Sequence, residues 1–327
     1  MKDKNRKIDV DSWQFKRLRE ILKEEYHIKN KKIYSFVRQE ASKRNIVYSI
    51  SCKYIEPSIT VKIYKIPQRQ RELINEINIF HILREHQYVV RAKWHRYCLC
   101  KVPEMISSGM DYILTKYVDG VNLTDIIQNR IQETYIDWDF LRDLINCLIL
   151  WLDGFYQKTN NLPDNCHIRN FSYKKGNKQE NKENILYGFD FEELMQITNE
   201  KDQNSGEKFK NKEAKFLKAI ARIYFSILAA KPGIVEGKSI KEKMKLGVII
   251  LNNIFDLPLF IFKNKDNNLK NKKRKELSRY FLQSIQSQGK EMIQQRIKYS
   301  HVENYDVEYI EENIQKVIRL IRREVNL

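Results

Sequence analysis

The sequence predicts an α+β protein with two lobes, a small N-terminal lobe built on an antiparallel sheet and one long helix, and a larger, mainly helical C-terminal lobe. Two observations lead to this prediction. Segments rich in Ile, Val and Tyr alternate with turns in the first part of the chain, and amphipathic helical patterns dominate after a turn at Asp119 and Gly120. With 327 residues and 42% hydrophobic content, the chain is long enough to bury a core in each lobe.

The first part of the chain contains both helical and extended patterns. A helix is expected from its candidate N-cap, Ser12, to Tyr26, within an N-terminal extension that comprises residues 1–30. The small lobe, residues 31–118, follows, with partial alternation of apolar residues in its strands and an amphipathic repeat in its helix. We expect three antiparallel strands within residues 32–65 and the helix at residues 69–86. Two further strands are expected, one within residues 96–109 and one within residues 111–118.

The remaining chain, residues 119–327, has the patterns of a helical lobe. Asn122 opens one helix, and a longer amphipathic stretch covers residues 137–157. A polar run at residues 174–182 precedes a short apolar strand that ends in Gly-Phe-Asp-Phe, which predicts a hairpin with a charged, solvated tip. Helical patterns dominate the last third of the chain, which also contains a second basic run at residues 266–275.

The composition restricts the classes of partner. Lys and Arg number 60 against 42 Asp and Glu, so this basic protein carries a formal charge of +18, which favours an anionic substrate or a polyanionic partner. Only 10 Gly are present, and a long glycine-rich phosphate loop is therefore not expected. Ser42, Lys43 and Arg44 lie in a predicted turn between the first two strands. This turn either contacts phosphates through its backbone amides and charge, or is a solvated hairpin turn.

Cysteine usage and hydropathy bear on localisation. The five cysteines are an odd number without the spacing of a disulfide framework, which suits a reducing compartment, and we therefore expect a cytoplasmic protein. The N-terminal residues contain no apolar signal segment, and no apolar run approaches the ~20 residues that span a bilayer. We accordingly expect no transmembrane segment.

The order of elements is the layout of a two-lobed, kinase-like phosphotransferase. Lys62 lies on a predicted strand directly before the amphipathic helix, where a lysine can hold the phosphates of ATP. That helix carries Glu72 and Glu76, and Glu76, nearer the helix middle, is the candidate for orienting Lys62 by ion pairing. The strand edge at the junction of the lobes offers backbone groups that can hydrogen-bond an adenine, from Lys116, Tyr117 and Val118.

Two oxygen-bearing side chains in the second lobe are candidate metal ligands. Asn170 follows a polar loop, and Asp190 comes twenty residues later, at the end of a short apolar strand. Mg²⁺ takes few protein oxygens beside phosphate and water, so one Asn and one Asp suffice, with Glu192 as an outer partner. Because Asp190 is flanked by phenylalanines, where an uncompensated carboxylate is unfavourable, a role in ligand binding or hydrogen bonding is expected.

On these residues the chain resembles the bacterial kinase-like superfamily that includes aminoglycoside and choline phosphotransferases and the lipopolysaccharide sugar kinases. The resemblance in layout covers most of residues 30–255. Those families carry a loop of the form His-Gly-Asp-x-His-x-x-Asn and a strand of the form Ile-Asp-Phe/Trp-Glu. Here His167 and Asn170 match the second half of the loop, and residues 189–192, Phe-Asp-Phe-Glu, match the strand. The resemblance implies ATP and Mg²⁺ as cofactors and a hydroxyl-bearing acceptor that is a small molecule, sugar or glycolipid. The basic composition suits an anionic acceptor.

The first half of the loop departs from the family pattern. Five residues before Asn170, where the family has its catalytic Asp, stands Asn165, and Asp164 lies one residue earlier. An amide cannot accept the proton of the attacking hydroxyl at neutral pH. Two interpretations therefore stay open: a shifted loop in which Asp164 is the base, or a pseudokinase that binds nucleotide as a regulator without efficient transfer.

A third hypothesis, from another class, is a nucleic-acid-binding protein. It depends on the charge of +18 and on the two basic runs. Against it, the runs lack interleaved aromatic residues and no recognition motif is present.

Overall fold

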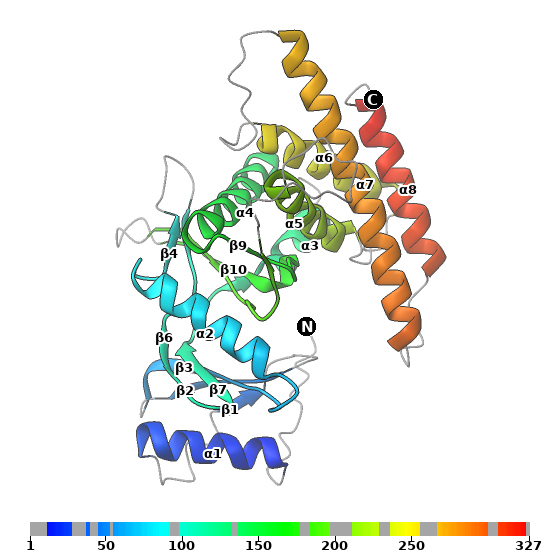
Figure 1. Cartoon of the computed structure of the whole chain (residues 1–327). Coiled ribbons are helices and arrows are strands. Elements are labelled where there is room, and N and C mark those ends of the chain that lie inside the picture. The colour runs from blue at the N-terminus through cyan, green and yellow to red at the C-terminus, as the bar shows by residue number, and fades with distance from the viewer. Residues whose placement is uncertain are drawn as a thin grey trace. The chain divides into compact units, whose positions relative to one another are not determined.

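The chain forms two compact units in the computed structural model (Figure 1). The first, here called the small lobe, comprises Met1–Val89, Val102–Asp119 and Phe191–Glu193; the second, the large lobe, comprises Val90–Lys101, Gly120–Asp190 and Leu194–Leu327. The structure describes residues 12–27, 37–39, 45–52, 55–91, 98–132, 137–176, 183–196, 211–228, 236–255, 267–299 and 307–324. The expected α+β class, with a small sheet-based lobe and a larger helical one, is confirmed.

The small lobe is built on a five-stranded antiparallel sheet of order β1-β2-β3-β7-β6. The first three of these strands confirm the expectation for residues 32–65. The bounds are β1 (Val37–Gln39), β2 (Ile46–Cys52), β3 (Ile55–Ile63), β6 (Met105–Ser108) and β7 (Tyr112–Lys116).

Alternation along β3 gives the sheet two different faces. Ile59, Val61 and Ile63 are buried in one cluster with the apolar residues of α1 (Trp13–Tyr26). Lys62, one residue out of step, points to the opposite face, on which α2 (Gln70–Arg84) lies (Figure 1).

Helix α1 is an integral part of the small lobe. Its predicted N-cap is confirmed, since the Ser12 hydroxyl accepts a hydrogen bond from the Phe15 amide at 3.3 Å. Its buried residues join the core of the sheet, and the Arg17 guanidinium donates to both carboxylate oxygens of Asp111 at 2.8 Å. The helix expected in an N-terminal extension therefore covers one face of the sheet.

The large lobe is centred on the long helix α4 (Trp138–Thr159). The Asp137 carboxylate caps its N-terminus by accepting from the Phe140 amide at 2.9 Å. Trp151 and Phe155 on this helix are completely buried and stack with ring centroids 5.0 Å apart. The amphipathic pattern of residues 137–157 thus predicted this central helix correctly.

A second five-stranded sheet packs against α4, with the order β4-β5-β11-β10-β8. The hairpin of β10 and β11 that the sequence predicts is confirmed, and the part of its expected tip at residues 177–182 lies outside the described residues. The bounds are β4 (Val89–Arg91), β5 (Leu99–Lys101), β8 (Val121–Asn122), β10 (Phe171–Lys174) and β11 (Ile185–Gly188).

The expectation of a single strand at residues 96–109 was wrong. The segment forms β5, which pairs in parallel with β11 in the large lobe, and β6, which pairs with β7 in the small lobe. Pro103 stands between them and has no amide hydrogen for a ladder, and the Val102 amide donates to the Tyr88 carbonyl at 3.1 Å. The extended pattern is therefore interrupted where the chain changes sheets.

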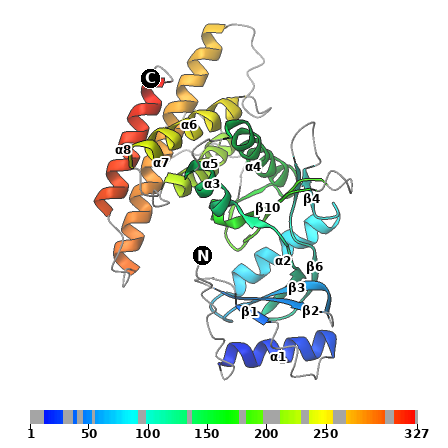
Figure 2. The same ribbon diagram turned by 180° about the vertical axis from the view of Figure 1, so that it is seen from behind.

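A short ladder and five helices complete the large lobe. Strands β9 (Asn161–Pro163) and β12 (Leu194–Gln196) are antiparallel, and the 3₁₀ turn η2 (Ile168–Asn170) follows β9. Helices α7 and α8 run side by side in opposite directions (Figures 1 and 2). The bounds are α3 (Leu123–Gln132), α5 (Asn211–Leu228), α6 (Glu236–Phe255), α7 (Asn267–Tyr299) and α8 (Val307–Glu324).

Among the helices of the described residues, none has both the length and the hydropathy that crossing a bilayer requires.

Gly154 marks a close approach of α4 to β4, and this generates a test of the large-lobe core. A Cβ at this position would lie 2.6 Å from the Val90 carbonyl oxygen and 3.1 Å from the Arg91 Cβ. Ala normally favours a helix over Gly by about 0.5–1 kcal/mol, but the collision is expected to outweigh this gain. We expect Gly154→Ala to lower the free energy of unfolding by about 1–3 kcal/mol in urea titrations.

The matched control is the exposed position Gln157 on the same helix. Gln157→Ala is expected to change the free energy of unfolding by less than about 0.5 kcal/mol. A Gly154→Ala variant as stable as the wild type would contradict the close packing of α4 on β4.

Candidate active site

The ammonium group of Lys62 is shared by two buried carboxylates of the small lobe. Its Nζ lies 2.7 Å from Glu76 Oε2 on α2 and 2.6 Å from Glu192 Oε1. The side chains of Glu76 and Glu192 are only 5% and 7% exposed, and that of Lys62 is 16% exposed. The structure therefore brings together the predicted pair of Lys62 and Glu76, and adds Glu192 as a third member.

Polar neighbours complete this group. The Tyr64 hydroxyl donates to Glu76 Oε2, and the Asn45 amide donates to Glu192 Oε1. Arg69 Nη1 lies 3.6 Å from Glu192 Oε2, and the Asn75 side chain donates to the Glu192 carbonyl at 3.1 Å. The segment around Glu192 is anchored as well by Phe191, whose fully buried ring meets that of Phe80 edge to face at 5.8 Å.

The group is held by charge balance. A buried carboxylate is strongly unfavourable unless it is paired and hydrogen-bonded. Burial, followed by the neighbouring charge of Glu76, raises the pKa of Tyr64 well above its usual value, so its hydroxyl keeps the proton that it donates. Removal of Lys62 would leave Glu76 and Glu192 as two buried like charges without the ammonium that they share.

The predicted adenine-binding segment has two of its amides already engaged. The Lys116 amide donates to the Glu104 carbonyl at 2.8 Å, and the Tyr117 amide donates to the Ser58 carbonyl at 2.7 Å. The Lys116 side chain forms an exposed ion pair with Glu104. Of the three predicted residues, Tyr117 and Val118 lie beyond β7 in irregular backbone. Contacts with a base through the amides of Lys116 and Tyr117 would require these bonds to open.

The second predicted group lies in the large lobe, where Asn165, Asn170 and Asp190 meet. The side-chain amides of Asn165 and Asn170 both donate to Asp190 Oδ2, at 3.2 Å and 3.4 Å. Asn170 also donates to the Asn165 carbonyl at 2.8 Å. The structure thus brings both predicted metal ligands together and places Asn165 beside them.

Local backbone contacts fix this loop. Asn170 is the last residue of the η2 turn, and its carbonyl accepts from the Phe189 amide at 2.9 Å. This bond holds the turn beside the segment that contains Asp190. The Ile168 amide donates to the Ser226 hydroxyl of α5 at 3.0 Å. Asp190 itself has a φ of 70°, in the left-handed region that residues other than Gly seldom adopt. Such backbone strain persists where the surroundings hold it and is frequent at functional sites.

Asp164, the other predicted catalytic residue, is turned to a different partner. Its carboxylate and its carbonyl both accept from the Arg222 guanidinium on α5. The Arg222 side chain is only 15% exposed, and that of Asp164 is 34% exposed. Asp164 thus belongs to a partly buried ion pair, whereas its neighbour Asn165 faces Asp190.

The donor set of the loop fits a hard divalent cation. The amide oxygen of Asn170 and the carboxylate of Asp190 supply only oxygen atoms, which Mg²⁺ prefers over nitrogen and sulfur. Both side chains are partly buried and are linked by one hydrogen bond, which the Asn170 amide nitrogen donates to Asp190. To share a cation with this carboxylate, the Asn170 amide would turn its oxygen to the same side. The residues therefore fit the ion that the sequence predicts.

Sequence reasoning missed several members of these groups. Tyr64 sits two residues after Lys62 on the same face, a spacing that could have indicated its role. Asn45 and Arg222 come from distant segments, and no local pattern points to them. Glu72, the alternative helix carboxylate, lies 3.4 Å from Arg69. The predicted turn at residues 42–44 lies outside the described residues.

Comparisons with known proteins add the following findings. No protein-family model matches the sequence, and no curated protein matches it. Among solved structures, the kinase domain of Mycobacterium tuberculosis PknI is similar at 11% identity, with coverage of 75% of this chain and 96% of that chain and a TM-score of 0.36. A mutant form of the same domain is similar at 13% identity, with the same coverage and a TM-score of 0.37. At these TM-scores, the assignment of the fold depends on the chain's own strand order and loops.

The shared ammonium group generates a stability test. Lys62→Met leaves Glu76 and Glu192 buried without their common partner, and we expect the free energy of unfolding to fall by about 3–5 kcal/mol. Adding Glu192→Gln removes one of the two charges and is expected to restore part of this loss. Chemical denaturation of the single and double variants measures both effects.

Lys116→Met serves as the control, because Lys116 and Glu104 form an ion pair whose side chains are 46% and 37% exposed. Its expected effect is at most about 1 kcal/mol. Equal losses in Lys62→Met and Lys116→Met would show that the buried arrangement does not hold the small lobe together.

Proposed function

We propose that the chain binds ATP with Mg²⁺ as a phosphotransferase of the aminoglycoside, choline and lipopolysaccharide sugar kinase type, with the hydroxyl of a small molecule, sugar or glycolipid as acceptor. The observation that carries the proposal is the hydrogen-bonded group of Asn165, Asn170 and Asp190. It unites an oxygen donor set for Mg²⁺ with the loop position that faces the acceptor in this type of enzyme. The ion pair of Lys62 and Glu76 supports it.

Each charged group has an assigned role in this proposal. The Lys62 ammonium holds phosphate oxygens, and Glu76 orients it from α2. Asn170 and Asp190 hold Mg²⁺, which supplies neutralisation of the charge that develops on the transferred phosphoryl group. Glu192 competes with phosphate for Lys62, since both need the same ammonium hydrogens. Nucleotide binding is therefore expected to loosen the bond between Lys62 and Glu192.

The reaction also needs a group that removes the proton from the acceptor hydroxyl. The Asn165 amide can orient a hydroxyl through its oxygen but cannot take up a proton at neutral pH. Asp164 can accept a proton, yet its carboxylate is already held by Arg222. Phosphoryl transfer depends mainly on positioning and charge stabilisation, so a slow reaction remains available without a strong base.

The ion pair of Asp164 and Arg222 favours one second candidate function, a pseudokinase that binds nucleotide and acts as a regulator. In that case Asp164 braces the loop and no residue removes the proton. The two functions share the nucleotide site and differ only in turnover.

Ligand-dependent stability tests the nucleotide site. A ligand that binds only the native state at 100 times its dissociation constant adds about 2.7 kcal/mol to the free energy of unfolding. We expect ATP with Mg²⁺ to raise the melting temperature of the wild type by roughly 3–6 °C. Asp190→Ala is expected to lose the magnesium-dependent part of this rise. Absence of any rise in the wild type at millimolar nucleotide would remove the basis of the proposal.

Asn165→Asp tests whether a missing base limits turnover. A well-placed general base contributes about 10²–10⁴-fold, and we expect ATP hydrolysis to rise by at least about 10-fold in this variant. Because the new carboxylate faces Asp190, the variant should be less stable than the wild type without Mg²⁺, and Mg²⁺ should restore the difference.

Asp164→Asn is the companion variant. If Asp164 is the base, this change abolishes the residual hydrolysis; if it braces the loop, stability falls while hydrolysis per folded molecule is unchanged. A wild type that binds nucleotide, with no hydrolysis in either the wild type or Asn165→Asp, establishes the regulator.

A further inference from the structure

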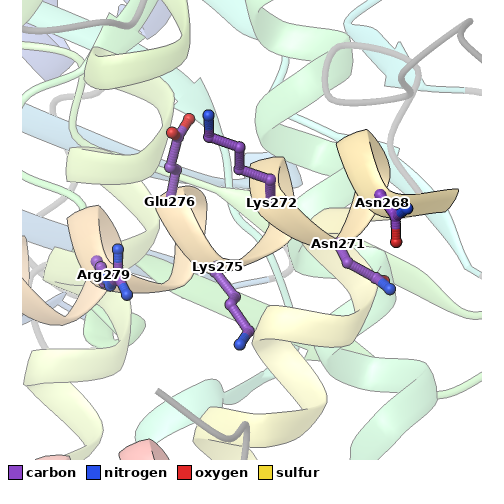
Figure 3. Close-up of a pocket in the computed structure, with 6 residues that line it drawn as sticks. All are labelled: Asn268, Asn271, Lys272, Lys275, Glu276 and Arg279. Carbon is purple, nitrogen blue, oxygen red and sulfur yellow. The ribbon is translucent and has the colours of Figure 1, made fainter. Parts of the chain in front are cut away.

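The N-terminal part of α7 carries an exposed basic surface that the proposed nucleotide site does not use. The second basic run of the sequence is helical here, from Asn267 onward, and its first turn contains no acidic residue. A shallow pocket of about 350 Å³ lies along this helix (Figure 3). We call its lining the α7 basic face, which consists of Asn268, Asn271, Lys272, Lys275, Glu276 and Arg279.

The residues of the α7 basic face form two rows along the helix. Positions 268, 272 and 276 form one row along the helix, and positions 271, 275 and 279 form a second row. Within a row the residues are four apart, a rise of about 6 Å. Figure 3 shows Lys272 and Glu276 extending to one side of the helix and Asn271 and Lys275 to the other. Lys272, Lys275 and Arg279 are all exposed.

This arrangement opposes the stability of the helix. Like charges four residues apart on a helix, such as those of Lys275 and Arg279, repel each other. Lys273 differs, since it lies 3.4 Å from Glu213 of α5 and serves packing. Exposed cations that repel each other without a gain in packing make this face a candidate for an anionic ligand.

The surroundings argue against a membrane as this ligand. The apolar side of α7 is used inside the large lobe, where Leu277, Phe281, Leu282 and Ile285 are at most 2% exposed. Interfacial helices instead present apolar side chains that enter the lipid. Among the described residues of α7 and α8, none is a large exposed hydrophobic side chain.

The mixture of groups fits a ribose–phosphate chain. A step of about 6 Å between cations spans two phosphates of one strand, which rise by about 3.4 Å each. Asparagine amides, with lysine and arginine, are the usual partners of phosphate and sugar oxygens. Glu276 is the one carboxylate of the α7 basic face; it is repelled by phosphate but can accept from a 2′-hydroxyl, which only RNA offers beside each phosphate.

We propose that the α7 basic face binds the ribose–phosphate backbone of RNA without sequence preference. Lys272, Lys275 and Arg279 contact phosphates, and Glu276 accepts from a ribose hydroxyl. This binding is independent of the nucleotide site proposed above.

The test uses the full chain and a fluorescein-labelled 20-nucleotide uridine strand, with binding followed by fluorescence anisotropy. The triple variant Lys272→Glu, Lys275→Glu, Arg279→Glu is expected to bind at least 10-fold more weakly. The slope of the logarithm of its association constant against the logarithm of the salt concentration should fall in magnitude by about 2, because three phosphate contacts are lost. All three positions are exposed, so the variant is expected to fold.

The matched control reverses three exposed cations of the small lobe, Lys16→Glu, Lys23→Glu and Arg71→Glu, which changes the net charge equally. Its affinity should stay within about threefold of the wild type at 150 mM salt. Equal weakening in both triple variants would reduce the effect to net charge and overturn the proposal. Equally tight binding of polyglutamate or of anionic vesicles would also overturn it.

Glu276→Gln tests the contact with ribose. The wild type is expected to prefer the uridine strand over a thymidine deoxy strand, and this preference should disappear in the variant while its affinity for DNA rises. A preference unchanged by Glu276→Gln, or no preference in the wild type, would overturn the assignment to RNA.

Discussion

The small lobe depends on one ammonium group. Lys62 lies next to the last residue of β3, and two buried carboxylates, one on α2 and one directly after Phe191, both need its charge. Because a buried carboxylate without a cation is strongly unfavourable, the strand, the helix and the distant segment are fixed to one another by this requirement. Tyr64 and Asn45 supply the remaining hydrogen bonds. The same ammonium is the group that a phosphate would use, so structural and functional demands meet at one atom.

The loop of the large lobe depends on one uncharged side chain beside Asp190. Asn165 is uncharged, so it can donate to Asp190 without adding a second negative charge beside it. Aspartate at this position would need a cation to balance the pair. The loop is therefore stable as it stands, with Asp164 turned to Arg222 and Ser226 holding the Ile168 amide.

The sequence was sufficient to predict the elements whose patterns are local. Ser12 was predicted as a cap, and the apolar repeat of residues 137–157 defined α4, because capping and amphipathicity involve neighbours in the chain. The association of Lys62 with Glu76, and of Asn170 with Asp190, followed from the order of strands and helices. The roles of Glu192 and Arg222 could not be predicted, because each depends on a tertiary contact with a residue more than fifty positions away. The parallel pairing of β5 with β11 escaped prediction for the same reason.

The small lobe is not a continuous part of the chain. It takes Met1–Val89 and Val102–Asp119 from the first third of the sequence, and Phe191–Glu193 from far beyond them. A fragment that ends at Asp119 would lack Glu192, and it would carry β5 without β11 to pair with. The small lobe is therefore completed only after the chain has extended to Glu193, when β5, β10 and β11 of the large lobe have already been made. During synthesis the two lobes cannot be finished one after the other.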